Sequence, residues 1–266
     1  MSEPELLTSI DGPIARIVFN RPQARNALTQ NMLDLMSAFI AEAEDNPDVR
    51  VLVMSGAGEH FMAGGDVGDF QSVLEKPGPE RATILRRTAE RALPVFDAMA
   101  RFSRPVVVKI RGAVAGASIT WAAAADFAII SDTAFFVFAH VHLGLSPDGG
   151  LTYHLPRVVG ARKAAELILL GERIKADEAL AIGLATKLVP DAELDEETEK
   201  LLARLARGPG LAIARSKRLL EQSLDNPREE QMRLEVEALS ACVASDDLVE
   251  GVRAFAEKRK PVFKGQ

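Results

Sequence analysis

The stretch Val-Val-Val-Lys-Ile-Arg-Gly-Ala-Val-Ala-Gly-Ala-Ser, residues 106–118, decides the class of fold. Its first five residues are rich in valine and isoleucine and follow a proline, which predicts a buried strand. The small residues from 112 onward lead into an Ala-rich helix expected around residues 121–125. This arrangement lets a ligand atom reach backbone N–H groups at a helix N-terminus, where the dipole favours negative charge. Tight packing of the helix is an equally good and compatible interpretation.

The remaining pattern of the first 190 residues alternates strands with helices. Residues 14–20 and 50–55 also have the composition of short strands. Apolar residues at helical spacing predict a helix from Leu28 to Ala43 that ends before Asn46-Pro47, and a second helix is expected over residues 81–99. Strands alternating with helices favour an α/β sheet with crossover helices.

From Glu193 onward the pattern is almost purely helical. We expect helices around residues 201–206, 211–224, 227–244 and 248–258. The sequence therefore predicts two parts: an α/β core over residues 1–192 that carries the site, and a helical appendage over residues 193–266. The appendage is expected to cover the site or to pack on another subunit.

Composition narrows the class of protein. The chain has 266 residues, 47% of them hydrophobic, which suits one main domain. Its net charge of −6 disfavours non-specific binding to nucleic acid. The longest apolar stretches are about half of a membrane-spanning helix, so no membrane association is expected. An acidic start without an apolar signal region and a single cysteine, Cys242, predict a cytoplasmic protein.

A second glycine-rich segment, Phe61-Met62-Ala63-Gly64-Gly65-Asp66, follows the strand at residues 50–55. Two adjacent glycines before an aspartate suit a turn where the backbone closely approaches another group. An aspartate that caps a helix explains the same pattern on structural grounds alone.

Taken in order, several motifs resemble the crotonase superfamily of enoyl-CoA hydratases and isomerases. The resemblance runs nearly end to end and rests on residues 20–22, 26–28, 63–66, 112–118, 173–184 and 250–263. It implies a superhelix of repeated ββα units, a homotrimer or hexamer, and an acyl-CoA substrate. Coenzyme A is then part of the substrate, and no separate cofactor or metal is expected.

The resemblance also assigns roles to residues. It implies an oxyanion hole made by the backbone N–H groups of Gly65 and Ala117, and one such donor contributes about 2.7–4 kcal/mol of transition-state stabilisation. It further implies contacts with the substrate at Ala24, Arg25, Ala63, Asp66, Thr120, Phe255 and Lys258. The last two of these would reach the coenzyme A of a neighbouring subunit.

The sequence departs from the hydratases at the residues that move protons. Hydratases carry two glutamates, whereas the aligned residues here are Thr120 and His140. Threonine is neither an acid nor a base near neutral pH, so only His140 retains this ability. A semi-buried histidine with satisfied hydrogen bonds is an alternative interpretation of His140.

Asp148, in the segment Pro-Asp-Gly-Gly, is the compensating candidate. Some isomerases of the family, including ring-epoxide and Δ3,Δ2-enoyl-CoA types, carry their acid/base carboxylate at this position. The structural alternative is an ordinary turn or helix-capping aspartate.

Four functions stay open at this stage. The first is an enoyl-CoA isomerase that uses Asp148 as acid and base. The second is an enoyl-CoA hydratase that uses His140, and the third is a coenzyme A-binding homologue without catalysis. A serine hydrolase using Ser118 with His140 ranks last, because the Gly-x-Ser-x-Gly motif is absent around Ser118.

Overall fold

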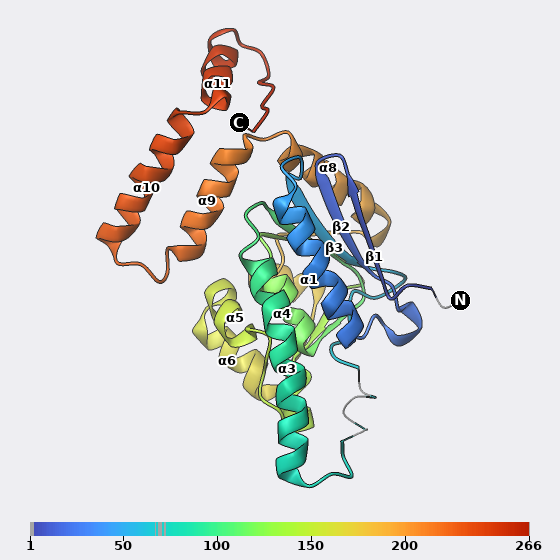
Figure 1. The fold of residues 1–266 in the computed structure, drawn as a ribbon. Helices are drawn as coiled ribbons and strands as arrows, with labels where there is room; N and C mark the ends of the chain where they lie inside the picture. Colours follow the sequence, from blue (N-terminus) through green and yellow to red (C-terminus); the bar gives the residue numbers. More distant parts are fainter. Residues whose placement is uncertain (1–2, 67, 69–70, 72, 266) are drawn as a thin grey trace.

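The computed structural model describes residues 3–66, 68, 71 and 73–265 and contains two sheets (Figure 1). The larger sheet has six strands in the order β1-β2-β3-β4-β6-β9. Their bounds are Leu6–Asp11, Ile14–Phe19, Val51–Gly56, Val106–Ile110, Phe127–Ser131 and Lys187–Val189. The strands β1 and β2 form an antiparallel hairpin, and every later pairing in this sheet is parallel.

The three strands that the sequence predicts are β2, β3 and β4, each within one residue of its expected bounds. The strand β4 continues through residues 111–112 into a second sheet with the order β5-β7-β8. These strands span Ala113–Ala115, Phe135–Val137 and Arg173–Lys175. The small residues 113–115 are therefore a short strand, and the 3-10 helix η2, Gly116–Ser118, follows them.

The helices of the core pack around these sheets. The helix α1, Gln30–Asp45, begins after Thr29, whose side chain accepts a hydrogen bond from the Met32 N–H. The helix α3, Gly78–Ala100, begins three residues before the predicted start at Arg81, and its side packs on α1. The helix α4, Ile119–Ala124, is the expected Ala-rich helix. Beyond it lie α5 (Leu151–Val159), α6 (Ala161–Leu170) and α7 (Ala176–Ala181).

Large buried side chains from these elements fill one main core. Phe19, Met36, Phe61 and Trp121 are fully buried and belong to the same hydrophobic cluster. Because Trp121 lies on α4 and Phe61 lies in the second glycine-rich segment, the core directly supports both motifs singled out in the sequence.

The helical C-terminal region is present as predicted, with α8 (Leu194–Ala206), α9 (Gly210–Gln222), α10 (Arg228–Val243) and α11 (Asp246–Ala256). The helix α8 packs on the larger sheet, since the buried Leu202 contacts a cluster with Val51, Val53 and Val107. The helices α9 to α11 project from the core (Figure 1). The predicted boundary after residue 192 assigns α8 to the appendage, whereas α8 packs on the sheet of the core. The division into two parts stays a prediction.

Across the part of the chain that the structure describes, every helix is too short or too polar to cross a membrane.

Candidate active site

The two glycine-rich segments lie side by side. The Phe61 N–H donates to the Arg111 carbonyl at 2.9 Å, and the Ala115 N–H donates to the Met62 carbonyl at 3.0 Å. Gly64, with φ of +90°, completes the approach, because a Cβ atom there would lie 2.9 Å from the Ala115 carbonyl oxygen. A side chain at position 64 would therefore separate the two segments.

The N–H groups of Gly65 and Ala117 lie in these two segments. Leu28 pairs with the segment on both sides of Gly65, since its N–H donates to the Gly64 carbonyl and its carbonyl accepts from Asp66. Outside the hydrogen bonds internal to helices and strands, none of the described residues accepts a backbone hydrogen bond from Gly65 or Ala117. Gly65 is exposed and Ala117 is half-buried. Their role as an oxyanion hole stays a prediction.

Ser118 holds the two segments together. Its buried hydroxyl accepts from the Ala115 N–H at 3.0 Å and lies within hydrogen-bond distance of the Met62 and Ala115 carbonyls, at 2.9 and 2.8 Å. The backbone thus uses both the proton and the lone pairs of this hydroxyl. The geometry gives no support to a serine hydrolase, because Ser118 engages backbone groups rather than a histidine.

His140 and Asp148 meet beside the same segments. His140 lies in the 3-10 helix η3, Ala139–Leu143, and its Nε2 is 3.6 Å from Asp148 Oδ1. That distance is longer than a hydrogen bond, so the two groups are neighbours rather than a bonded pair. A Cβ atom at Gly116 would lie 3.9 Å from the same nitrogen. His140 is 9% exposed, whereas the Asp148 side chain is 51% exposed.

Thr120 lies one helical turn after Ala117, and its side chain is buried. Its Oγ1 has no hydrogen-bond partner among the described residues. A buried hydroxyl without a partner is uncommon in folded proteins and marks a place where a ligand or water can supply the missing bond. This observation fits the predicted contact between Thr120 and substrate, which stays a prediction.

Asp66 is held by structural contacts. Its carboxylate accepts from the Gly68 N–H at 3.0 Å and from Arg21 Nη1 at 2.9 Å. The hydrogen bond from Gly68, followed by the one from Arg21, lowers the pKa of Asp66 below its ordinary value. Arg21 also donates to the Ala27 carbonyl, so it ties the Gly65 segment to the N-terminal part of the chain. The sequence pattern showed Arg21 only as part of a motif and gave no sign of this partner.

The structure also brings together three residues predicted to contact coenzyme A. The Ala63 N–H donates to the Arg25 carbonyl at 3.0 Å, and Ala24 lies next to Arg25 in the chain, in the 3-10 helix η1, Pro22–Ala24. Phe255 and Lys258 lie instead at the end of α11, on the part that projects from the core (Figure 1). Phe255 is 88% exposed. Their contact with substrate stays a prediction that needs a second subunit.

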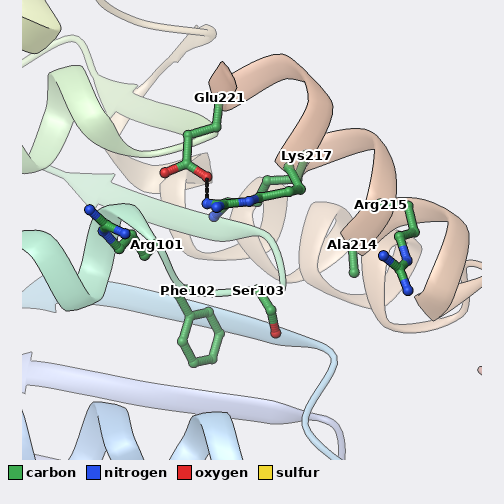
Figure 2. A pocket seen from close by; sticks show the side chains of 8 residues that line it. Arg101, Phe102, Ser103, Ala214, Arg215, Lys217 and Glu221 are labelled. Carbon is green, nitrogen blue, oxygen red and sulfur yellow. Dashed lines mark hydrogen bonds and ion pairs between the residues drawn. The ribbon is translucent and has the colours of Figure 1, made fainter. Parts of the chain in front are cut away.

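A separate hollow of about 310 Å³ lies between residues 101–103 and the helix α9 (Figure 2). Its lining includes Lys217, which pairs with Asp126, and Arg218, which pairs with Glu221. None of the predicted site residues lines it. The hollow is therefore distinct from the Gly65 and Ala117 site.

The larger mostly parallel sheet, the small second sheet and the meeting of the two glycine-rich segments define a crotonase-like α/β protein. Comparison with known proteins agrees. The family model described as enoyl-CoA hydratase/isomerase matches residues 9–266. The chain belongs to this family, and the fold class predicted from the sequence is confirmed.

Individual relatives cover the chain from end to end. A probable enoyl-CoA hydratase of Rhodobacter capsulatus is 36% identical over 266 residues, covering 100% of both chains. A trans-2-decenoyl-[acyl-carrier-protein] isomerase of Streptococcus mutans is 33% identical with the same coverage. A crystal structure of a putative enoyl-CoA hydratase/isomerase from Mycobacterium abscessus superposes with a TM-score of 0.92 at 33% identity. It covers 98% of this chain and 100% of its own.

Proposed function

We propose that this protein is an enoyl-CoA isomerase in which Asp148 is both acid and base. The observation that carries the proposal is the position of the Asp148 carboxylate, 3.6 Å from His140 Nε2, because the same nitrogen lies near Gly116, the residue before Ala117. A base must lie near the carbon it deprotonates, and the donors must lie near the oxygen that becomes negative. In the proposal, His140 is the neighbour that the base shares with the segment of Ala117.

The proposed reaction moves one double bond without gain or loss of atoms. The Asp148 carboxylate takes a proton from C2 of a 3-enoyl-CoA, and the electron pair of that C–H bond forms a dienolate. The negative charge on the thioester oxygen is held by the N–H groups of Gly65 and Ala117. The protonated Asp148 then returns the proton to C4 as the electrons move back, which leaves the double bond between C2 and C3. A ring-epoxide substrate would use the same oxyanion site.

Thr120 supports an isomerase over a hydratase. Hydration needs one group to activate water and another to deliver a proton, and Thr120 supplies neither near neutral pH. The Streptococcus mutans relative is named as an isomerase, although its named substrate is carried on acyl-carrier protein.

A hydratase is the second candidate, favoured by one contact. His140 and Asp148 are close enough to share the two roles that the paired glutamates have in hydratases. The Rhodobacter capsulatus relative is named a probable hydratase. Hydration of crotonyl-CoA that is robust and lost in His140→Ala would favour this candidate and contradict Asp148-based isomerisation.

The third candidate is a coenzyme A-binding protein without catalysis. Exchange of the C2 proton of an acyl-CoA in deuterated water separates it from both enzymes, because exchange requires an enolate. Conversion of a 3-enoyl-CoA to the conjugated 2-enoyl-CoA, followed by ultraviolet absorbance, is the direct test of the proposal. Absence of conversion together with absence of exchange would leave only the binding role.

Binding is expected to need no metal or other cofactor. Calorimetry should detect coenzyme A and acyl-CoA at micromolar levels in the presence of a chelator. Binding that the chelator abolishes would contradict the proposed site.

The proposed assembly is a homotrimer or hexamer built by the C-terminal helices. Exposed apolar side chains follow one another along α10 at helical spacing: Met232, Val236, Leu239 and Val243. Such a stripe is typical of a helix face that packs on another chain. Light scattering tests the assembly, and a fully active monomer at micromolar concentration would remove the role proposed for Phe255 and Lys258. A cytoplasmic location is proposed on the sequence argument alone.

A further inference from the structure

Two buried aromatic rings connect the loop of Asp148 to the helix that follows the oxyanion segment. Phe96 of α3 stacks on Trp121 of α4, with ring centroids 4.1 Å apart and planes inclined by 12°. Phe96 is 6% exposed and Trp121 is fully buried. Protein interiors are packed as densely as organic crystals, so a displacement of one ring of the stack displaces the other.

The Cζ end of the Phe96 ring lies close to Gly149, the residue after Asp148. A Cβ atom at Gly149 would lie 2.8 Å from Phe96 Cζ and 3.0 Å from Cε2. Gly149 also has φ of +62°, a conformation that glycine adopts without strain. The Phe96 ring therefore occupies the space that a side chain at position 149 would need.

Further contacts connect these residues to the proposed site. Ser118 anchors the start of α4 to the Met62 carbonyl, on the segment that leads to Gly65. His140 lies between Asp148 and Gly116. Asp148 thus has His140 as a neighbour of its carboxylate and Phe96 as a neighbour of the next residue, Gly149.

We propose that Phe96 is a positioning residue that fixes Asp148 relative to the N–H groups of Gly65 and Ala117. The inference rests on the proposed function, because it gives Phe96 a role in proton transfer by Asp148. The physical reason is geometric: proton transfer requires the base within hydrogen-bond reach of the reacting carbon, and a misplacement of about 1 Å can cost about 10²-fold in rate. Phe96 acts through its neighbours Gly149 and Trp121.

The test compares Phe96→Leu with Phe102→Leu. Phe102 is also a buried phenylalanine of the same core cluster, but it takes no part in the contacts described for Trp121 and Gly149. Both substitutions remove a ring from the core, so both should destabilise the protein similarly. Only Phe96→Leu should lower kcat for 3-enoyl-CoA isomerisation, by about 10- to 100-fold. Its KM should stay within about twofold, because the contacts proposed for coenzyme A at residues 24, 25 and 63 do not involve Phe96.

A second variant guards against loss of folding. Phe96→Tyr keeps the ring stack and adds an oxygen at Cζ, the ring atom that faces Gly149, so it should displace the Asp148 loop by overpacking. Crystal structures of the wild type and the three variants then give the separation of Asp148 Oδ1 from His140 Nε2. The proposal expects this separation to change by about 1 Å in a Phe96 variant and to be unchanged in Phe102→Leu, in line with the loss of kcat.

An unmoved Asp148 in the Phe96 variants, or a kcat equal to that of Phe102→Leu, would overturn the inference. If the wild type isomerises no 3-enoyl-CoA, the proposed function fails. The displacement of Asp148 in the crystal structures still decides whether Phe96 positions it.

Discussion

Lys217 helps to attach the projecting C-terminal helices to the core, and its replacement by methionine should weaken this attachment. Lys217 Nζ donates to Asp126 Oδ2 at 2.7 Å and to the Arg104 carbonyl at 3.0 Å. Its side chain is 11% exposed, and Asp126 is partly buried. Methionine keeps the length and apolar character of the lysine stem, so the substitution removes chiefly the charge and the two hydrogen bonds.

The magnitude follows from what remains at Asp126. Removing one partner of a fully buried ion pair costs about 3–5 kcal/mol, because the other charge is left uncompensated. Asp126 keeps its hydrogen bond from the Val106 N–H at 2.7 Å and is partly open to water. We therefore expect Lys217→Met to lower the free energy of unfolding by about 2 kcal/mol. For a chain of this size that corresponds to a melting temperature lower by about 4–8 °C.

Calorimetric melts at one fixed protein concentration measure this change, since assembly would make stability depend on concentration. The matched control is Arg218→Met, on the next residue of α9. The Arg218 side chain is 53% exposed, so the loss of its pair with Glu221 should cost less than about 0.5 kcal/mol. Equal melting temperatures for the two variants would refute the anchoring role of Lys217.

Two further predictions concern pH. The pKa of Asp66 is lowered by Gly68 and Arg21, so its contribution to stability is present above the ordinary value of 3.8 and is lost as pH falls through its lower folded value. Asp66→Asn should therefore reduce the free energy of unfolding at pH 7 and weaken the dependence of that free energy on pH below 4. Urea unfolding at pH 7 and at pH values below 4 measures both effects. Burial lowers the pKa of His154 below 6.5, so the unfolded chain takes up this proton first as pH falls. Stability should fall from pH 7 to pH 5, and melts of His154→Gln should show a smaller fall; an unchanged fall would contradict the assignment to His154.

The sequence predicts a strand well where the strand is a continuous apolar run of five or six residues. The strands β3 and β4 are short apolar runs, buried along almost their whole length, and they were predicted within one residue. The strand β1 was missed because it is an edge strand with mostly exposed side chains and therefore no clear alternation. The strands β5, β7, β8 and β9 have three residues each, too few to establish a period.

The candidate site also has features that the local sequence predicts and features that it does not. Small residues mark the two glycine-rich segments, because only small residues permit the approach of Gly64 to the Ala115 carbonyl. The resemblance to a family, rather than any local pattern, selected His140 and Asp148. The contacts of Arg21 with Asp66 and of Phe96 with Gly149 join residues far apart in the chain, and a phenylalanine at helical spacing looks like any other core residue.

The central claim is that Asp148 transfers the proton. The most direct measurement is the rate of isomerisation of a 3-enoyl-CoA by Asp148→Asn in deuterated water, with incorporation of deuterium at C2 followed in the same reaction. Asparagine keeps the size and much of the hydrogen bonding of aspartate but has no basic carboxylate. Both rates should fall by about 10²–10⁴-fold while coenzyme A binding and folding are retained. Near wild-type rates of isomerisation and exchange would contradict the account and leave Asp148 as a turn residue.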